Sequence, residues 1–225
     1  MSNFDLQSDP LLGRPCLSYQ LQFCLPAEAR AAFAEISSQL AKHVPSGLWL
    51  APAETLHVTC SSLISPRDDW YDKDQFWSRI SSLVAESVRQ IKLQVPAFRL
   101  HFGALRVTDR AIVVLADDEP CVARARAIVA QLIPSPETRS QPPPDTIHAS
   151  LCRYSEAASL PNDLRDLAAT HQPDIWAEIE TLTLVRETTY PSLTVDTITS
   201  IPLARRTPRR AGVPNGAAPR QLYPG

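Results

Sequence analysis

Two short stretches of the sequence repeat one pattern of side chains that could do chemistry. The first lies in the segment TLHVTCSSL and the second in TIHASLCRY. In each, a hydroxyl residue follows a histidine by two positions, which pairs His57 with Thr59 and His148 with Ser150. Alternate side chains of a β-strand point to the same face, so each histidine shares a face with its hydroxyl. One such strand is common by chance and a lone strand histidine is more often structural, but two copies in similar contexts indicate a shared site.

Two imidazoles and two hydroxyls at one cleft suit the cleavage of a phosphodiester bond. The unperturbed imidazole pKa of about 6.5 lets two histidines divide the acid and base work near neutral pH. Such a reaction needs a base for the attacking oxygen and an acid for the departing oxygen. The hydroxyls of Thr59 and Ser150 can donate hydrogen bonds to the non-bridging phosphate oxygens as charge builds there. Which histidine is the base stays open at this point.

The surrounding sequence predicts two similar strand–helix–strand units, each ending in a histidine strand. Apolar and polar residues alternate in the strands, and apolar residues recur with the helical period in the helices. The first unit spans residues 17–25, 28–43 and 55–63. The second unit spans residues 111–116, 119–133 and 146–153. Two such lobes facing each other would bring the histidine strands side by side at a shared cleft.

The rest of the chain predicts further elements and two poorly packed ends. We expect helices at 74–91 and 161–171, a strand at 97–107, and two closing strands near 178–188 and 193–202. Residues 1–16 are predicted to be a flexible N-terminal extension, and residues 17–203 form the domain. Residues 204–225 are rich in arginine and proline with little to bury, which predicts a disordered tail.

Composition limits the class of protein. A chain of 225 residues with 44% hydrophobic content can form one sizeable core, or two small lobes that share one. It has no run of 18 apolar residues, so we expect no membrane span, and its first residues lack the apolar region of a signal peptide. Its five scattered cysteines form no CxxC pair, which argues against disulfides and zinc and favours a reducing cytoplasm.

The charge distribution argues against a binder of long nucleic acids. The net charge is −2, but the tail after Leu203 contains five arginines and no acidic residue, so the body is more acidic than the whole chain. Affinity for long nucleic acids depends on neutralising many phosphates with basic side chains. An acidic body therefore favours a small substrate, with a local positive pocket for one phosphate.

The paired motifs, HVTC at His57 and HASL at His148, resemble the signature of the 2H phosphoesterase superfamily. This group includes the bacterial 2′-5′ RNA ligase-like proteins and the 2′,3′-cyclic phosphodiesterases. The segment FCLP, which leads into the first helix, is similar to the opening strand of the family. The segment LTLVRE, followed by Tyr190 and Leu193, is similar to its closing hairpin. The resemblance covers about residues 17–203.

The resemblance implies an α+β, bilobal fold of two pseudo-symmetric lobes, whose antiparallel sheets form a concave groove with helices outside. It implies a metal-independent phosphodiesterase without a cofactor, which hydrolyses 2′,3′-cyclic phosphates of nucleotides or RNA ends. His57 and His148 would be catalytic, and Thr59 and Ser150 would bind the substrate. We expect a monomer that acts on a nucleotide or short RNA and does not bind membranes.

Two alternatives stay open on the same scaffold. One is a 2′-5′ oligoadenylate nuclease or an RNA-end 3′-5′ nuclease. The other is a non-catalytic nucleotide- or RNA-binding module, which has no chemical need for both histidines.

Two further residues are candidates for the groove. Tyr190, in the turn before the last strand, could stack on a base, and packing in the core is its alternative role. His101, between Leu100 and Phe102 on a predicted strand, is a weaker candidate for lining the groove.

Overall fold

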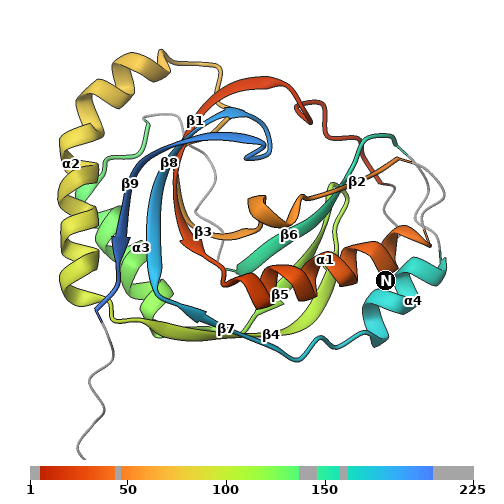
Figure 1. Cartoon of the computed structure of the whole chain (residues 1–225). Helices are drawn as coiled ribbons and strands as arrows, with labels where there is room; N and C mark the ends of the chain where they lie inside the picture. The colour runs from red at the N-terminus through yellow and green to blue at the C-terminus, as the bar shows by residue number, and fades with distance from the viewer. Residues whose placement is uncertain (1–5, 44–46, 137–145, 158–161, 205–225) are drawn as a thin grey trace, which may run out of the picture.

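The computed structural model describes residues 6–43, 47–136, 146–157 and 162–204, and its strands form two antiparallel sheets (Figure 1). The first sheet contains, in order across it, β3 (His57–Ile64), β1 (Pro15–Cys24), β8 (Thr181–Thr189) and β9 (Thr194–Pro202). The second contains β2 (Leu48–Leu50), β6 (Ile147–Tyr154), β5 (Ala111–Ala116), β4 (Phe98–Val107) and β7 (Ile175–Ile179). The α+β fold class predicted from the sequence is confirmed.

Within the described ranges, four α-helices and one short 3₁₀ helix connect the strands. They are α1 (Ala27–Ala41), η1 (Ala53–Thr55), α2 (Lys73–Gln94), α3 (Pro120–Leu132) and α4 (Asn162–Thr170). Two helix starts are fixed by side chains that accept hydrogen bonds from backbone N–H groups, as acidic N-caps do. Asp72 caps α2 at the N–H of Gln75, and Glu119 caps α3 at the N–H of Cys121, with Pro120 at the first helical position.

The predicted strand 178–188 is in fact two strands, β7 and β8, on either side of Glu180. β7 pairs with β4 in the second sheet, whereas β8 pairs with β1 and β9 in the first. The chain therefore passes from one sheet to the other at Glu180. The sequence has the period of a strand on both sides of Glu180, so periodicity alone predicted one continuous strand.

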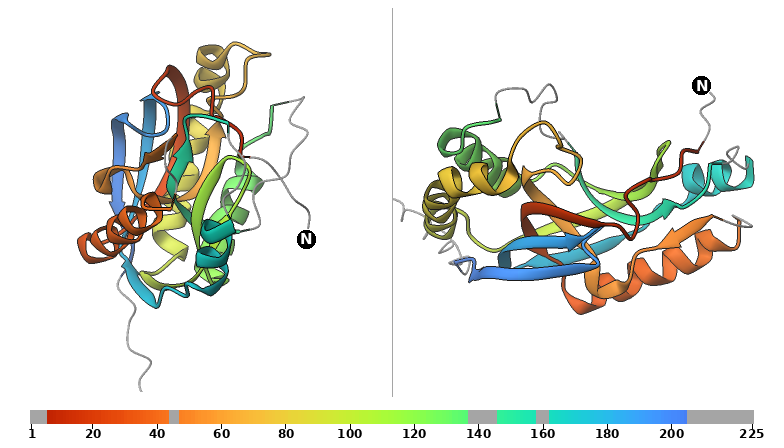
Figure 2. Two further views of the ribbon diagram at one scale, coloured as in Figure 1. Left: turned by 90° about the vertical axis from the view of Figure 1, so that its right-hand side faces the viewer. Right: turned by 90° about the horizontal axis from the view of Figure 1, so that it is seen from above.

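The helices of the two repeated units, α1 and α3, each pack against the sheet to which the strand before them does not belong. α1 follows β1 of the first sheet but contacts β2, β6 and β7 of the second. α3 follows β5 of the second sheet but contacts β3 of the first, beside α2. The right-hand view of Figure 2 shows α2 and α3 together at one end of the molecule and α1 along another side. One continuous hydrophobic core results, with residues from both sheets and from all four helices.

The N-terminal segment 6–14 is packed on the body, in contrast to the flexible extension expected for residues 1–16. Leu6 is only 2% exposed and belongs to the core. The backbone N–H of Gln7 donates to the carbonyl of Asp109, and that of Asp9 donates to the carbonyl of Tyr154. The sequence pattern missed this segment because it is held by irregular backbone hydrogen bonds and one buried leucine, without a regular period.

The other end of the chain is described as far as Ala204. Its carbonyl accepts from the N–H of Ala97 at 2.7 Å, so the backbone is paired up to this residue. The predicted disordered tail, residues 204–225, otherwise lies outside the described residues. No helix in the described ranges is both long and apolar enough to cross a membrane.

Arg126 on α3 joins the two histidine strands, which belong to different sheets. Its Nε donates to the carbonyl of Cys60 at 3.1 Å, and one terminal nitrogen donates to the carbonyl of Thr59 at 3.1 Å. The same terminal nitrogen also donates to the carbonyl of Thr146 at 3.2 Å, next to β6. A planar guanidinium group can serve several acceptors at once. This one therefore fixes β3 relative to β6.

Replacing Arg126 with lysine should destabilise the protein, because an ammonium group cannot reach all three carbonyl oxygens in one geometry. The expected loss in the free energy of unfolding is about 1–3 kcal/mol, the cost of leaving part-buried acceptors unsatisfied. Urea denaturation measures it. Arg124→Lys, at an exposed arginine on the same helix, is the matched control and should change stability by less than about 0.5 kcal/mol. Equal losses in the two variants would contradict the role given to Arg126.

Candidate active site

All five site residues predicted from the sequence line one pocket of about 200 Å³. They are His57, Thr59, His148, Ser150 and Tyr190. The first two come from β3 of the first sheet, and the next two from β6 of the second. Figure 1 shows these two strands at the centre of the molecule, where the sheets meet. The paired motifs thus lie at one shared site, as their repetition predicted.

The ring of His57 is oriented by the backbone just before β3. Its Nδ1 lies 2.7 Å from the carbonyl oxygen of Thr55. A carbonyl can only accept a hydrogen bond, so Nδ1 carries the hydrogen, and Nε2 of the neutral ring is left with its lone pair. Thr55 is itself fixed in η1, where its N–H and its hydroxyl both donate to the carbonyl of Pro52.

Burial lowers the pKa of His57 to about 4. The hydrogen bond to Thr55 opposes this shift, whereas the positive charges of protonated His148 and of Arg153 increase it. The ring is therefore neutral at pH 7, as a general base must be before it takes a proton.

His148 has a different environment from that of His57. Its Nδ1 lies 3.5 Å from the hydroxyl oxygen of Thr146. Burial lowers its pKa, and the guanidinium groups of Arg126, Arg153 and Arg106 lower it further, whereas a hydrogen bond with the backbone of Thr146 raises it. The lowered pKa favours the neutral form in the free protein, and a bound anion would favour protonation.

The two hydroxyl residues have the orientation that strand alternation predicts. Thr59 and Ser150 are partly exposed, and the residues that follow each histidine directly, Val58 and Ala149, are fully buried. The hydroxyls therefore face the pocket while the apolar face of each strand packs into the core. This arrangement places a hydrogen-bond donor beside each imidazole.

Arg153 lines the same pocket but was missed in the sequence analysis. It lies five residues after His148, so strict alternation would place it on the opposite face. In the pairing of β6 with β5, Val113 lies opposite Ser150 and Ile112 lies opposite Cys152, which leaves Leu151 as an extra residue. This β-bulge reverses the alternation beyond it and turns Arg153 toward the pocket.

The first histidine strand has a bulge at the corresponding position. Gln22 lies opposite Thr59 and Leu21 lies opposite Ser61, which leaves Cys60 as the extra residue. Ser62, five residues after His57, is thereby brought to the pocket. The two motifs therefore share their bulge as well as their residue pattern, and Ser62 occupies the position that Arg153 has in the second lobe.

Tyr190 lines the pocket, but its environment favours the packing role over base stacking. It is only 7% exposed, and the guanidinium groups of Arg67 and Arg153 lie 5.4 Å and 5.0 Å from the centre of its ring. Its hydroxyl donates to Oδ2 of Asp9 at 3.0 Å and accepts from Arg67 at 3.0 Å. These contacts fix the ring beside the two arginines.

A buried carboxylate, Glu187, forms the floor of the pocket near the β8–β9 turn. It is 1% exposed and accepts hydrogen bonds from the hydroxyl of Ser18, the side-chain amide of Gln20 and the backbone N–H of Ser192. Gln20 also donates to the hydroxyl of Ser192 at 3.3 Å. This network orients polar side chains that line the pocket. The sequence offered no motif for it, because its members come from β1, from β8 and from the turn after β8, which are far apart along the chain.

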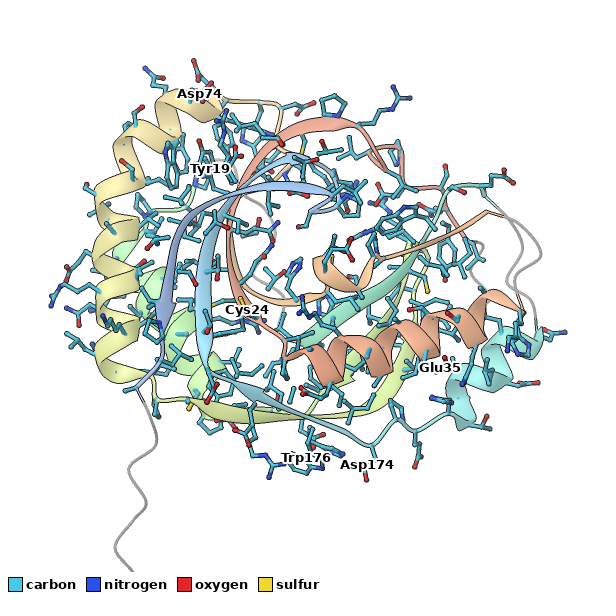
Figure 3. The ribbon with its side chains drawn as sticks, in the orientation of Figure 1. Tyr19, Cys24, Glu35, Asp74, Asp174 and Trp176 are labelled. Atoms are coloured by element: carbon cyan, nitrogen blue, oxygen red, sulfur yellow. The ribbon has the colours of Figure 1, made fainter. Side chains whose placement is uncertain are left out.

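His101 is not among the residues that line this pocket. Its two ring nitrogens lie 2.8 Å from Asp117 and 3.0 Å from Asp174, and its ring stacks on Trp176. Figure 3 shows Asp174 and Trp176 at the outer edge of the molecule, away from its centre. Hydrogen bonds to the two carboxylates raise the pKa of His101. It therefore belongs to a surface cluster.

We expect both pocket histidines to titrate below the ordinary imidazole pKa of about 6.5, with His57 near 4. NMR of the two rings across pH measures this directly, and added inorganic phosphate should raise both values because an anion stabilises the imidazolium. Since His57 binds its proton more readily in the unfolded chain, stability should fall as pH decreases from about 6.5 toward 4. Titration of both rings at or above 6.5 would contradict the environment described.

Comparison with known proteins identifies the fold. No protein-family model matches the sequence, and no curated protein sequence matches it either. Among solved structures, the protein TT0787 of Thermus thermophilus superposes with a TM-score of 0.61 and 18% identity, over 84% of this chain and 100% of that chain. E. coli LigT in complex with 3′-AMP superposes with a TM-score of 0.57 and 17% identity, over 85% of this chain and 100% of that chain. A structure described as a phosphoesterase superposes with a TM-score of 0.55 and 17% identity, over 84% of this chain and 99% of that chain. The chain thus shares the fold of TT0787 and LigT, in agreement with the fold expected from the resemblance of the paired motifs.

Proposed function

We propose that the protein is a metal-independent phosphodiesterase that hydrolyses 2′,3′-cyclic phosphates of nucleotides or RNA ends. The observation that carries this proposal is the composition of one pocket. Two histidines from different sheets line it, each with a hydroxyl residue beside it, and the guanidinium group of Arg153 belongs to the same lining. Two groups for proton transfer and three donors for phosphate oxygens are what an in-line displacement at phosphorus requires.

The two histidines have different environments, which supports different roles. His57 has a pKa of about 4 and an Nε2 lone pair fixed by the hydrogen bond of Nδ1, so we assign it as the base. His148 is assigned as the acid. It has charged neighbours on three elements and gains its proton when the substrate anion binds, because a nearby negative charge stabilises the imidazolium.

The reaction then balances as follows. His57 takes a proton from water while the water oxygen forms a bond to phosphorus. The bond from phosphorus to one ribose oxygen breaks, and that oxygen takes the proton of His148. The hydroxyls of Thr59 and Ser150, with the guanidinium of Arg153, donate to the non-bridging oxygens as they gain charge. The product is a ribose phosphomonoester, and exchange with solvent restores both histidines.

The size of the pocket supports a small substrate. At about 200 Å³ it lies below the range of about 300–1,000 Å³ typical of ligand pockets. It suits a phosphate with its ribose better than a long chain. The LigT structures in complex with 3′-AMP, ATP and NADP⁺ concern that protein. They support the proposal insofar as a pocket of this fold can hold a nucleotide.

A 2′-5′ or RNA-end nuclease is the second candidate, and one observation favours it. A further crevice adjoins His57 and is lined by Arg30, Glu54 and Gln22, among others, and it shares Ser192 with the main pocket. It could hold a second nucleoside beyond the scissile phosphate. A panel of 2′,3′-cyclic nucleotides and of 2′-5′ and 3′-5′ dinucleotides, with identification of the products, separates the two candidates.

On the best substrate of that panel, His57→Ala and His148→Ala should each lower turnover by about 10²–10⁴-fold, because each removes one proton transfer. The double variant should lose less than the product of the two, since the pair acts as a unit. Thr59→Val and Ser150→Ala should cost less, because both proton transfers are kept. Steady-state kinetics on folded variants measures these effects.

His101→Ala is the matched control for the two pocket histidines, because its ring is part of the surface cluster. It should retain turnover within about twofold of the unaltered protein. Full turnover by a folded His57→Ala variant would show that the repeated motif is only structural, and a binding module would then be the better interpretation.

Treatment with EDTA should leave turnover unchanged. Within the part of the chain that the structure describes, no three His, Cys, Asp or Glu side chains gather as metal ligands do. The proposed steps use only side chains that line the pocket. Loss of turnover on chelation, restored by one divalent ion, would contradict the metal-independent mechanism.

A further inference from the structure

A buried carboxylate stands behind the pocket, between two arginines. Oδ1 and Oδ2 of Asp9 accept from one terminal nitrogen of Arg67 at 3.1 and 3.0 Å. Oδ2 also accepts from Arg153 at 3.1 Å and from the hydroxyl of Tyr190 at 3.0 Å. The side chain of Asp9 is 0% exposed, whereas those of Arg67 and Arg153 are 35% and 18% exposed. One fixed carboxylate thus holds two guanidinium groups that reach toward solvent.

The charges of this cluster do not cancel. Two guanidinium groups and one carboxylate leave one surplus positive charge beside the pocket, within a protein whose body is acidic. Nε of Arg153 is buried and has no hydrogen-bond partner among the described residues. This buried nitrogen cannot reach a substrate, but the side chain keeps 18% of its surface exposed and lines the pocket, and a guanidinium group there can bind phosphate oxygens.

Asp9 is held in place independently of the arginines. Its own N–H donates to the carbonyl of Tyr154 at the end of β6, and the N–H of Gly13 donates to the carbonyl of Tyr190 in the β8–β9 turn. The N–H of Tyr190 donates in return to the carbonyl of Arg14. The segment 6–14 is thereby attached to both sheets. The carboxylate is the fixed partner, and the long arginine side chains are the ones whose positions it sets.

We propose that segment 6–14 is part of the active site, and that Asp9 is a positioning residue that holds Arg153 in the orientation in which it binds the substrate phosphate. Arg67 and Tyr190 complete the cluster and limit the orientations open to Asp9 and Arg153. The inference rests on the proposed function, since it assigns Arg153 to the phosphate of that reaction. It extends the site to a segment that precedes the first strand and the family-like part of the sequence.

The electrostatic state of Asp9 agrees with this role. Burial alone would raise the pKa of Asp9, but the charges of Arg67 and Arg153 lower it below its ordinary value, together with hydrogen bonds from Leu11 and Tyr190. Asp9 is therefore ionised throughout the neutral range. The guanidinium of Arg153 in turn lowers the pKa values of both pocket histidines, which places its charge close to them.

The test uses the full chain and two substitutions of Asp9. Asp9→Asn keeps the shape of the side chain and removes its charge, and Asp9→Glu keeps the charge on a longer side chain. Asp118→Asn removes one exposed acidic residue outside the pocket and is the control for net charge. The measurements are the Kd of inorganic phosphate, followed by NMR of the histidine rings, and the kinetics on the best substrate of the panel.

We expect Asp9→Asn to weaken phosphate binding and to lower kcat/KM by about 10²-fold, the order of effect that a misplacement of about 1 Å can have. Asp9→Glu should restore part of both losses, and Asp118→Asn should change neither. A folded Asp9→Asn variant with an unchanged phosphate Kd and unchanged kcat/KM would overturn the inference. If Asp9→Asn does not fold, unchanged values for Asp9→Glu would overturn it equally.

The phosphate measurement separates this inference from the proposed function. If the unaltered protein turns over no member of the panel, the proposed function fails, and the Kd of inorganic phosphate still decides the role of Asp9. If turnover is found but neither turnover nor the phosphate Kd changes in Asp9→Asn, the inference fails while the function stands. Weaker phosphate binding in Asp9→Asn, with partial recovery in Asp9→Glu, supports the inference in either case.

Discussion

The site depends on holding together two strands that belong to different sheets. β3 and β6 carry the histidines, and a ladder of hydrogen bonds links each of them only to partners in its own sheet. Their relative position is set instead by the guanidinium of Arg126 and by the exchange of crossover helices between the lobes. Because α1 and α3 each pack on the opposite lobe, the lobes cannot move apart without opening the common core. The distance between the two imidazoles is therefore fixed by the fold, as acid–base catalysis at one phosphorus requires.

The charges around the pocket make its protonation depend on what is bound. Arginines from three elements surround His148, and both histidines are buried enough for burial to be the main cause of their lowered pKa values. A phosphate anion in the pocket reverses this balance, because it compensates the guanidinium groups and stabilises an imidazolium. The free protein thus keeps two neutral imidazoles, and under the proposed function the substrate anion would bring about the acid form of one of them. Proton uptake by a pocket histidine would thus be coupled to the binding of an anion.

Much of this arrangement could be predicted from periodicity and repetition. Both strand–helix–strand units, their order, and the pocket position of His57, Thr59, His148 and Ser150 followed from alternation along single strands. Arg153 could not be found in this way, because a one-residue bulge reverses the alternation and local sequence does not specify it. Asp9 was missed for another reason: its role arises from long-range contacts with residues 58, 144 and 181 positions away along the chain. Irregular backbone with a single buried leucine has no periodic pattern to detect.

The two lobes are alike in backbone and different in chemistry, and this difference is what assigns the roles. Each histidine strand has its bulge three residues after the histidine, which turns the fifth residue toward the pocket. In the first lobe that residue is the neutral Ser62, and in the second it is the cationic Arg153, held by Asp9. Both histidines have a backbone hydrogen bond with the residue two positions before them, Thr55 or Thr146. They differ in their charged neighbours, since Arg126, Arg153 and Arg106 all lower the pKa of His148. A symmetric pair of imidazoles would have no preferred direction of proton transfer. The unequal fifth residues add a positive charge from the strand of His148, which in the proposed reaction would help to hold the phosphate at the two histidines.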